Sequence, residues 1–282
     1  NKIQDPAFRG NAILMVTPTQ GTGRNTLAEI AGRLVGLANY IEMKFSELSG
    51  KSDFNEYQAK GLLFVPEVLG GSDSKGDRFR VYEKLKNDID PKAARITINP
   101  KYGRKYETYC HTSFLMATNH RDALHNHQGD RRFAVLSNPD VPRSGEYFTN
   151  LNEEWLYHPE KWLDHLYTEM MNYDLEGWNG EEPAPMTVAK QHMIEQGMGP
   201  GDRIGQAVLK HWPLDAVPVV DLQDAVVDAC HDLASKGESV YGEDAVRGHA
   251  VKYIAKNVSS IQRLGKSGHY QVKLENGKRV RI

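Results

Sequence analysis

A glycine-rich segment, P-T-Q-G-T-G-R-N-T from Pro18 to Thr26, has the residue types and spacing of a phosphate-binding turn. It follows a short apolar run, residues 12–16, and precedes a helical pattern over residues 26–39. Glycines let backbone N–H groups crowd around an anion, and the N-terminus of a helix adds a positive dipole. The segment therefore predicts a cradle for phosphate, although a turn of this kind can also be an ordinary connection.

The segment departs from the usual pattern G-x-x-x-x-G-K-[ST] at three positions. Pro18 stands at the first glycine, Arg24 at the lysine and Asn25 at the hydroxyl residue. Arginine replaces a point charge by a planar fork, and asparagine offers an amide oxygen where a hydroxyl normally meets Mg²⁺. The chemistry of the cradle is therefore expected to be altered.

An acidic residue, Glu67, follows the apolar strand pattern of residues 61–65. ATPases with a phosphate-binding turn need a carboxylate at such a strand end, to hold Mg²⁺ or to polarise the attacking water. Pro66 occupies the position where these proteins usually have an aspartate, so one metal carboxylate is missing. Together with Arg24 and Asn25, this departure leaves a slow or inactive ATPase open. Surface strands also often end in glutamate, and the motif alone does not distinguish a functional carboxylate from an ordinary surface glutamate.

Two further polar motifs flank strand patterns downstream. Asn119 ends the apolar run of residues 113–117, where an amide can touch the γ-phosphate and orient water, or can simply begin a turn. Arg131 and Arg132 precede the run of residues 133–136. Arginines at an interface between subunits can stabilise charge on a neighbour's γ-phosphate, whereas the alternative is a surface pair with Asp130.

Basic and aromatic residues gather between these strands. Residues 75–105 hold ten basic and four acidic side chains. Within this stretch, N-P-K-Y-G-R-K-Y from Asn99 to Tyr106 alternates basic and aromatic residues. Positive side chains suit nucleic-acid phosphates, and aromatic rings suit base stacking. The pattern predicts a hairpin that contacts nucleic acid, with a solvated charged surface as the alternative.

The elements that position these motifs are short apolar runs alternating with helical patterns, from residue 12 to about residue 140. This alternation predicts an α/β fold, a three-layer sandwich, with strands at residues 12–16, 61–65, 113–117 and 133–136. Helices are expected at residues 155–173 and 187–196, the second with Thr187 as its N-cap. The glycines around Pro200 place a domain boundary there, which gives a first domain over residues 1–196, a linker over 197–203 and a second domain over 204–282.

The second domain is expected to be a winged helix. Helical patterns cover residues 202–211, 221–235 and 242–256, and strand patterns cover 259–264 and 270–282, with an Asn276-Gly277 hairpin turn. Residues 247–282 carry nine basic residues and one acidic residue, whereas the whole chain has 35 basic and 37 acidic residues. This asymmetry predicts a surface for DNA, although winged helices also dock proteins. The candidate DNA contacts are Arg247, Lys252, Lys256, Lys266, Lys273, Lys278, Arg279 and Arg281.

Composition excludes several classes of protein. The two cysteines, Cys110 and Cys230, form no C-x-x-C motif, which argues against a disulfide scaffold or a cysteine zinc site and favours a reducing compartment. No apolar run approaches the roughly 18 residues of a membrane helix. Because the chain begins at Asn1 and the first strand follows almost at once, we expect a fragment of a longer protein.

The order of the motifs resembles the superfamily 3 helicases of the AAA+ class, above all phage and prophage primase-helicases related to the poxvirus type. The segments most similar to this family are K-Y-G-R-K-Y, F-L-M-A-T-N-H-R-D-A-L and D-R-R-F-A-V-L, followed by A-P-M-T-V-A-K at residues 184–190. The resemblance covers roughly residues 10–195. It is specific in the order and spacing of the motifs, and less so in each motif.

This resemblance implies a hexameric ring that hydrolyses ATP and moves along single-stranded or forked DNA in the cytoplasm of a bacterial host. Such motors are often fused to an N-terminal primase or polymerase. Carried over by position, Glu67 would take the Walker B role, Asn119 would be the sensor, Arg131 or Arg132 would be the finger, and Asn25 and Glu67 would hold Mg²⁺. ATP would be bound by Gly21, Thr22, Gly23, Arg24, Asn25 and Thr26, and DNA in the pore by Lys101, Arg104 and Lys105.

Two other functions stay open on the sequence. The rival is a non-hydrolysing replication or initiator module that uses the same fold to assemble and to bind DNA. A kinase of small molecules is disfavoured, because it explains neither the basic hairpin nor the charged tail.

Overall fold

The computed structural model describes most of the chain, which divides into two compact units, Asn1–Gly197 and Met198–Ile282. The described residues are 1–49, 54–68, 82–83, 85–86, 88–89, 95–124, 129–138, 141–198, 200–211, 219–235, 248–250, 252–254, 271–273 and 279–281.

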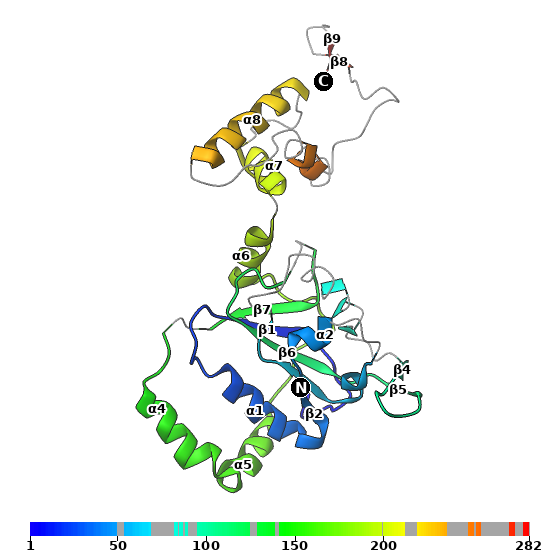
Figure 1. Cartoon of the computed structure of the whole chain (residues 1–282), viewed down its shortest axis with the longest axis vertical. Helices are drawn as coiled ribbons and strands as arrows, with labels where there is room; N and C mark the ends of the chain where they lie inside the picture. Colours follow the sequence, from blue (N-terminus) through cyan, green and yellow to red (C-terminus); the bar gives the residue numbers. More distant parts are fainter. Residues whose placement is uncertain are drawn as a thin grey trace. The chain divides into compact units, whose positions relative to one another are not determined.

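A five-stranded parallel sheet forms the centre of the first unit (Figure 1). Its strand order is β2-β3-β6-β1-β7. The bounds are β1 (Ala12–Val16), β2 (Tyr40–Glu42), β3 (Leu62–Val65), β6 (Ser113–Thr118) and β7 (Phe133–Ser137). The four strands predicted from apolar runs are confirmed to within a residue at each end. The edge strand β2 was missed, because three residues are too few to show a periodicity.

Alternate residues of the strands enter two different cores, as the pleat of a sheet requires. Leu14, Leu63 and Met116 lie on one face, in a cluster that also holds residues of α2 (Phe45–Ser49) and of α6 (Val188–Gly197), together with the helical residues Tyr82 and Leu85. Met15 and Phe64 lie on the other face, against α1 (Arg24–Val35). The first unit is therefore an α/β fold with helical residues packed on both faces of the sheet.

Two predicted helices have different bounds in the structure, each for a local reason. α1 stops at Gly36, whose φ of 86° is left-handed, and a 3₁₀ turn, η1 (Leu37–Asn39), follows. The helix predicted over 155–173 is split before Pro159 into a π-helical turn, η3 (Leu151–Leu156), and α5 (Pro159–Asn172). α6 begins as expected, and the Thr187 hydroxyl accepts a hydrogen bond from the Lys190 backbone N–H at 3.1 Å.

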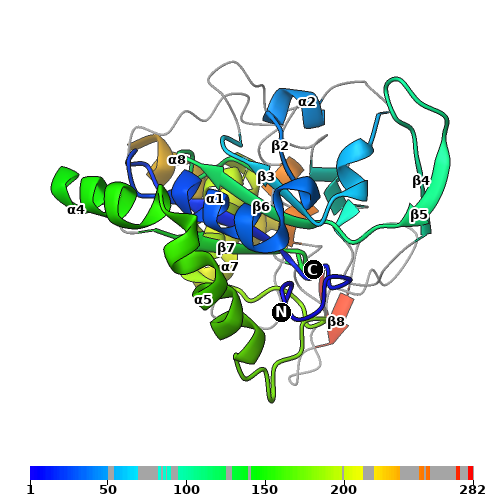
Figure 2. The same cartoon turned by 90° about the horizontal axis from the view of Figure 1, so that it is seen from below.

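A two-stranded antiparallel hairpin, β4 (Arg95–Ile98) and β5 (Tyr106–Tyr109), projects from the first unit on the side away from α4 (Gly145–Asn150) (Figure 2). Its base is fixed to the 3₁₀ turn η2 (Glu56–Ala59) and the residue before it. The Asn55 amide donates to the Thr97 carbonyl at 3.0 Å and accepts from the Asn99 N–H at 2.7 Å. The hairpin therefore has a fixed base and an exposed loop at residues 101–105.

The second unit contains α7 (Pro200–His211), α8 (Val219–Ser235) and helical residues 248–250 and 252–254. These helical residues share one core, which contains Ile204, Val226, Ala250 and Ile254. α7 begins inside the predicted linker 197–203, because proline is well tolerated at the first position of a helix. β8 (Gln271–Lys273) and β9 (Arg279–Arg281) pair antiparallel, as the hairpin prediction requires.

The winged helix itself stays a prediction. The turn residues 274–278 and the strand expected at 259–264 lie outside the described residues, and the described part does not show this fold. Among the helices that the structure describes, none combines the length and apolarity needed to span a membrane.

Candidate functional site

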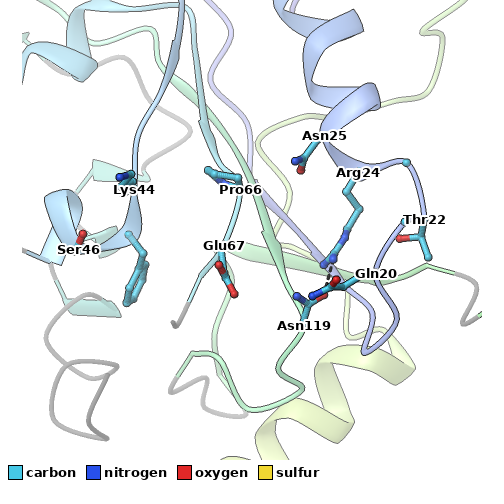
Figure 3. A pocket seen from close by; sticks show the side chains of 12 residues that line it. Gln20, Thr22, Arg24, Asn25, Lys44, Ser46, Pro66, Glu67 and Asn119 are labelled. Carbon is cyan, nitrogen blue, oxygen red and sulfur yellow. Dashed lines mark hydrogen bonds between the residues drawn. The ribbon is translucent and has the colours of Figure 1, made fainter. Parts of the chain in front are cut away.

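A cavity of about 670 Å³ lies at the edge of the sheet where the parallel strands end (Figure 3). Ligands of open α/β sheets bind outside the carboxyl ends of the strands. Segments that follow β1, β2, β3 and β6 line this cavity, and they are separated widely in the sequence. The lining residues are Gln20, Gly21, Thr22, Gly23, Arg24, Asn25, Lys44, Phe45, Ser46, Pro66, Glu67 and Asn119.

The glycine-rich turn has the backbone that its sequence predicts. Gly21 has a φ of 74° and Gly23 a φ of 83°, which are left-handed values that favour glycine. Gly23 is the N-cap of α1, no side chain caps this end, and the first turn has no acidic residue. The first N–H groups of α1 are therefore left to a ligand, and the dipole of the helix favours an anion.

Arg24 joins this turn to the end of β6. Its guanidinium donates to the Thr118 carbonyl and to the Asn119 Oδ1, each at 2.5 Å. Burial lowers the pKa of the Arg24 guanidinium, and the negative charge of Glu67 opposes this shift. Because arginine only donates, it fixes the Asn119 amide with Oδ1 toward Arg24, which leaves the Nδ2 as the donating end. A lysine ammonium lacks the planar fork that spans both acceptors.

Glu67 is brought beside Asn119 by hydrogen bonds to the backbone of the residue that follows it, Val68. The Val68 N–H donates to the Ala117 carbonyl at 2.7 Å, and the Thr118 hydroxyl donates to the Val68 carbonyl at 2.6 Å. Since β6 lies between β1 and β3, Asn119 sits between the strand that leads to the glycine-rich turn and the strand that leads to Glu67. Figure 3 shows Glu67 between Lys44 on one side and Arg24 on the other.

The predicted nucleotide-binding residues divide between two cavities. Asn25 and Glu67 both line the first cavity and are exposed there. Thr26 instead lines a second cavity on the other side of the turn, while Thr22 and Gly23 line both. Glu67 is the one acidic residue among the described residues that line the first cavity.

Lys44 and Ser46 line the first cavity without having been predicted. They follow β2, the strand that was too short to detect, so their place at the carboxyl edge was hidden. Lys44 is exposed and adds a second positive charge opposite Arg24 (Figure 3). The turn itself has no lysine, and this cavity instead receives a lysine from the end of the edge strand β2.

Arg131 and Arg132 lie outside both cavities. They precede β7, which runs parallel to β1, so they are at the opposite edge of the sheet from the glycine-rich turn. Arg131 is exposed, and Arg132 is half-buried. The two arginines therefore do not contribute to the cavity of their own chain.

A buried ion pair holds the segment that carries these arginines. Lys190 is fully buried, and its Nζ lies 3.1 Å from the Asp130 carboxylate, which also accepts from the Tyr82 hydroxyl at 2.7 Å. The same carboxylate accepts from the backbone N–H groups of Arg132 and Phe133. Burial by itself would raise the pKa of Asp130, but these hydrogen bonds and the Lys190 charge lower it overall.

The predicted DNA contacts of the first unit share one exposed loop. Lys101, Arg104 and Lys105 are all exposed between β4 and β5, and Tyr102 beside them is 90% exposed. The Lys101 Nζ lies 5.2 Å from the centroid of the Tyr102 ring. The basic and aromatic alternation seen in the sequence therefore reaches solvent at the tip of the hairpin.

The predicted DNA contacts of the second unit are described only in part. Lys252 is exposed on a helical segment, and the β8–β9 register pairs Lys273 with Arg279 and Gln271 with Arg281. Arg247, Lys256, Lys266 and Lys278 lie outside the described residues.

Comparisons with known proteins give one family match and a likeness in fold to one solved region. Residues 15–132 match the family of unknown function DUF5906. The apo structure of the NrS-1 C-terminal region superposes with a TM-score of 0.65 at 18% identity, covering 99% of this chain and 68% of that one. A second apo structure of this region, the A form, gives a TM-score of 0.63 at 15% identity, covering 100% and 68%. No curated protein matches the chain.

Proposed function

We propose that this chain is the motor part of a phage or mobile-element replication helicase, an ATPase that depends on nucleic acid. The observation that carries the proposal is the cavity where an uncapped helix N-terminus, Glu67 and Asn119 converge from three neighbouring strands. The exposed basic hairpin and the likeness in fold to the NrS-1 C-terminal region support it.

The polar groups around the turn, Glu67 and Asn119 have distinct tasks in this proposal. The N–H groups of the turn and the charges of Arg24 and Lys44 bind the phosphates of ATP. The Glu67 carboxylate accepts a hydrogen bond from the attacking water and polarises it. The Asn119 Nδ2 donates to the γ-phosphate or to that water, and its hydrogen bond from Arg24 keeps the amide in this orientation.

The donor set of the cavity fits a magnesium ion that arrives with the nucleotide. Mg²⁺ in nucleotide sites is held by one or two carboxylates, phosphate oxygens and water. Glu67 supplies the carboxylate and Asn25 an amide oxygen, and both are exposed to the cavity. When bound, the ion would neutralise charge on the transferred phosphoryl group.

The non-hydrolysing alternative rests on two features of the same cavity. Arg24 is engaged by Thr118 and Asn119, and the described lining has a single carboxylate. The rate of ATP turnover with and without single-stranded DNA separates the two functions. We expect turnover that rises with DNA; ATP binding without turnover would select the non-hydrolysing module.

Arg24→Ala is expected to weaken ATP binding by about ten-fold or more, because it removes a charged hydrogen-bond donor from the cavity. Arg24→Lys should keep turnover, since lysine is the usual residue at this position. Arg33→Ala is the matched control, because Arg33 lies on the same helix but pairs with Glu29 at 2.8 Å on the surface. Titration calorimetry gives the affinities; equal ATP affinity for wild type and Arg24→Ala would remove the turn from the site.

Reversing single charges in the hairpin loop is expected to weaken the binding of single-stranded DNA and to reduce its salt dependence. Lys101→Glu, Arg104→Glu and Lys105→Glu each place an acid beside the phosphates, and Tyr102→Ala should lose about ten-fold through lost stacking. Lys161→Glu on α5 makes the same charge change at an exposed site away from the hairpin (Figure 1). Fluorescence anisotropy measures the affinities, and equal losses for Lys161→Glu and the loop variants would count against a DNA-binding hairpin.

The second unit and the assembly complete the proposal. Its basic residues would bind forked DNA through phosphates, and identical chains would form a ring, with a hexamer as the expected size. The arginines at the far edge of the sheet then reach the cavity of a neighbour, because a head-to-tail ring brings opposite faces of two subunits together. A primase or polymerase part would precede this chain in the whole protein.

A further inference from the structure

A second cavity of about 670 Å³ adjoins the glycine-rich turn on the side away from Glu67. The turn is the wall between the two cavities, because Thr22 and Gly23 line both. The second cavity lies between α1, which contributes Leu27 and Ile30, and the chain from Val141 to η3. Any ligand held at the turn therefore has access to two compartments.

The two compartments differ in chemistry. The first is lined by Arg24, Lys44, Glu67 and Asn119, which suit phosphate and metal. The described lining of the second has no acidic residue, and it gathers apolar and aromatic side chains around one cation, Arg143. This division matches the two ends of a nucleotide, which are an anionic phosphate chain and a flat aromatic base.

Two aromatic rings form the wall of the second cavity. Tyr147 and Phe148 meet edge to face, with ring centroids 5.3 Å apart, and the Arg143 guanidinium lies 5.8 Å from the Tyr147 ring. A Cβ atom added to Gly23 would lie 3.6 Å from the Phe148 ring, so this ring is close to the turn itself. Tyr147 is 49% exposed and leaves ring surface for a ligand.

Local structure fixes these rings in the first turn of α4. The Ser144 hydroxyl caps the helix by accepting from the Tyr147 N–H at 3.2 Å, and the Ser144 carbonyl accepts from the Phe148 N–H at 3.3 Å. Thr22 lines both cavities, and its hydroxyl is buried without a hydrogen-bond partner among the described residues. A ribose or phosphate oxygen at the turn would supply that partner.

We propose that the second cavity holds the base of the nucleotide, stacked on the exposed Tyr147 ring and perpendicular to the Phe148 ring, while the phosphates lie in the first cavity. The inference rests on the proposed function, because it assigns the other end of the same nucleotide. Stacking between a base and an aromatic side chain adds affinity that a phosphate chain alone cannot obtain.

The test compares two probes on the full chain, ATP and inorganic tripolyphosphate, each with magnesium, by titration calorimetry. Wild type should bind ATP more tightly than tripolyphosphate. Tyr147→Ala should weaken ATP binding by about ten-fold and leave tripolyphosphate binding unchanged. Phe148→Leu keeps apolar volume beside the turn and should likewise weaken ATP alone. The control is Tyr157→Ala, a tyrosine of the same segment that is 71% exposed and does not line the cavity.

Each outcome decides the inference. Weaker ATP binding with unchanged tripolyphosphate binding in the two cavity variants, and no change in Tyr157→Ala, supports a base-binding cavity. Equal losses for both probes, or unchanged ATP binding, overturn it while the proposed function stands. If wild type binds neither probe, the proposed function fails, and the base-binding cavity fails with it.

Discussion

Glu67→Gln is expected to lower ATP turnover by at least about 100-fold while leaving ATP affinity nearly unchanged. Glutamine keeps the size of the side chain, but it lacks the carboxylate that polarises the attacking water. Glu42→Gln is the matched control, because Glu42 also ends a strand of the same sheet, is exposed and lies outside the cavity. Turnover is measured under saturating ATP with single-stranded DNA; full activity of Glu67→Gln would assign the carboxylate to another role.

The same variant tests whether Arg131 or Arg132 acts on a neighbouring subunit. One of the single variants, Arg131→Ala or Arg132→Ala, should bind ATP but lose turnover by about 1,000-fold, since such an arginine acts on transition-state charge. Mixing it with Glu67→Gln should restore some activity, because some interfaces in a mixed ring combine an intact Glu67 with an intact arginine. No rescue, together with a monomer at all concentrations with ATP, would argue against a ring.

Lys190→Met is expected to lower the free energy of unfolding of the first unit by about 3–5 kcal/mol, because it leaves the Asp130 carboxylate buried without its countercharge. Lys190→Met combined with Asp130→Asn removes both charges and should cost less than Lys190→Met alone. Lys86→Met is the control, since the Lys86–Glu83 pair has a similar length of 3.2 Å but lies on the surface. Lys86→Met should lower the free energy of unfolding by under about 1 kcal/mol.

Urea unfolding followed by tryptophan fluorescence measures these changes, because Trp155, Trp162 and Trp178 lie in the first unit and only Trp212 lies beyond it. The folded pKa of Asp130 is lowered, so its contribution is present above the unfolded pKa and is lost as pH falls through the folded pKa. Asp130→Asn should therefore be less sensitive to acid than wild type below about pH 4. A cost for Lys190→Met as small as that for Lys86→Met would contradict this account.

The sequence by itself determined the parts of the site that depend on a few consecutive residues. The apolar runs predicted β1, β3, β6 and β7, and the residues after them predicted the positions of the glycine-rich turn, Glu67 and Asn119. These signals are local, because side-chain alternation and left-handed glycines act over two to six residues. The antiparallel hairpins β4–β5 and β8–β9 were recognisable for the same reason.

The tertiary structure decided which of these residues meet. Arg24 and Asn119 are 95 positions apart in the sequence, and Lys190 and Asp130 are 60 apart, so only the strand order and the packing of α6 bring each pair together. β2 is too short to be seen in the sequence, and with it Lys44 was hidden. The second cavity exists because residues 141–151 lie against α1, and no periodicity records a contact between two helices distant along the chain. Local patterns therefore determined the chemistry that each strand end offers, and the order of strands in the sheet determined which groups share a cavity.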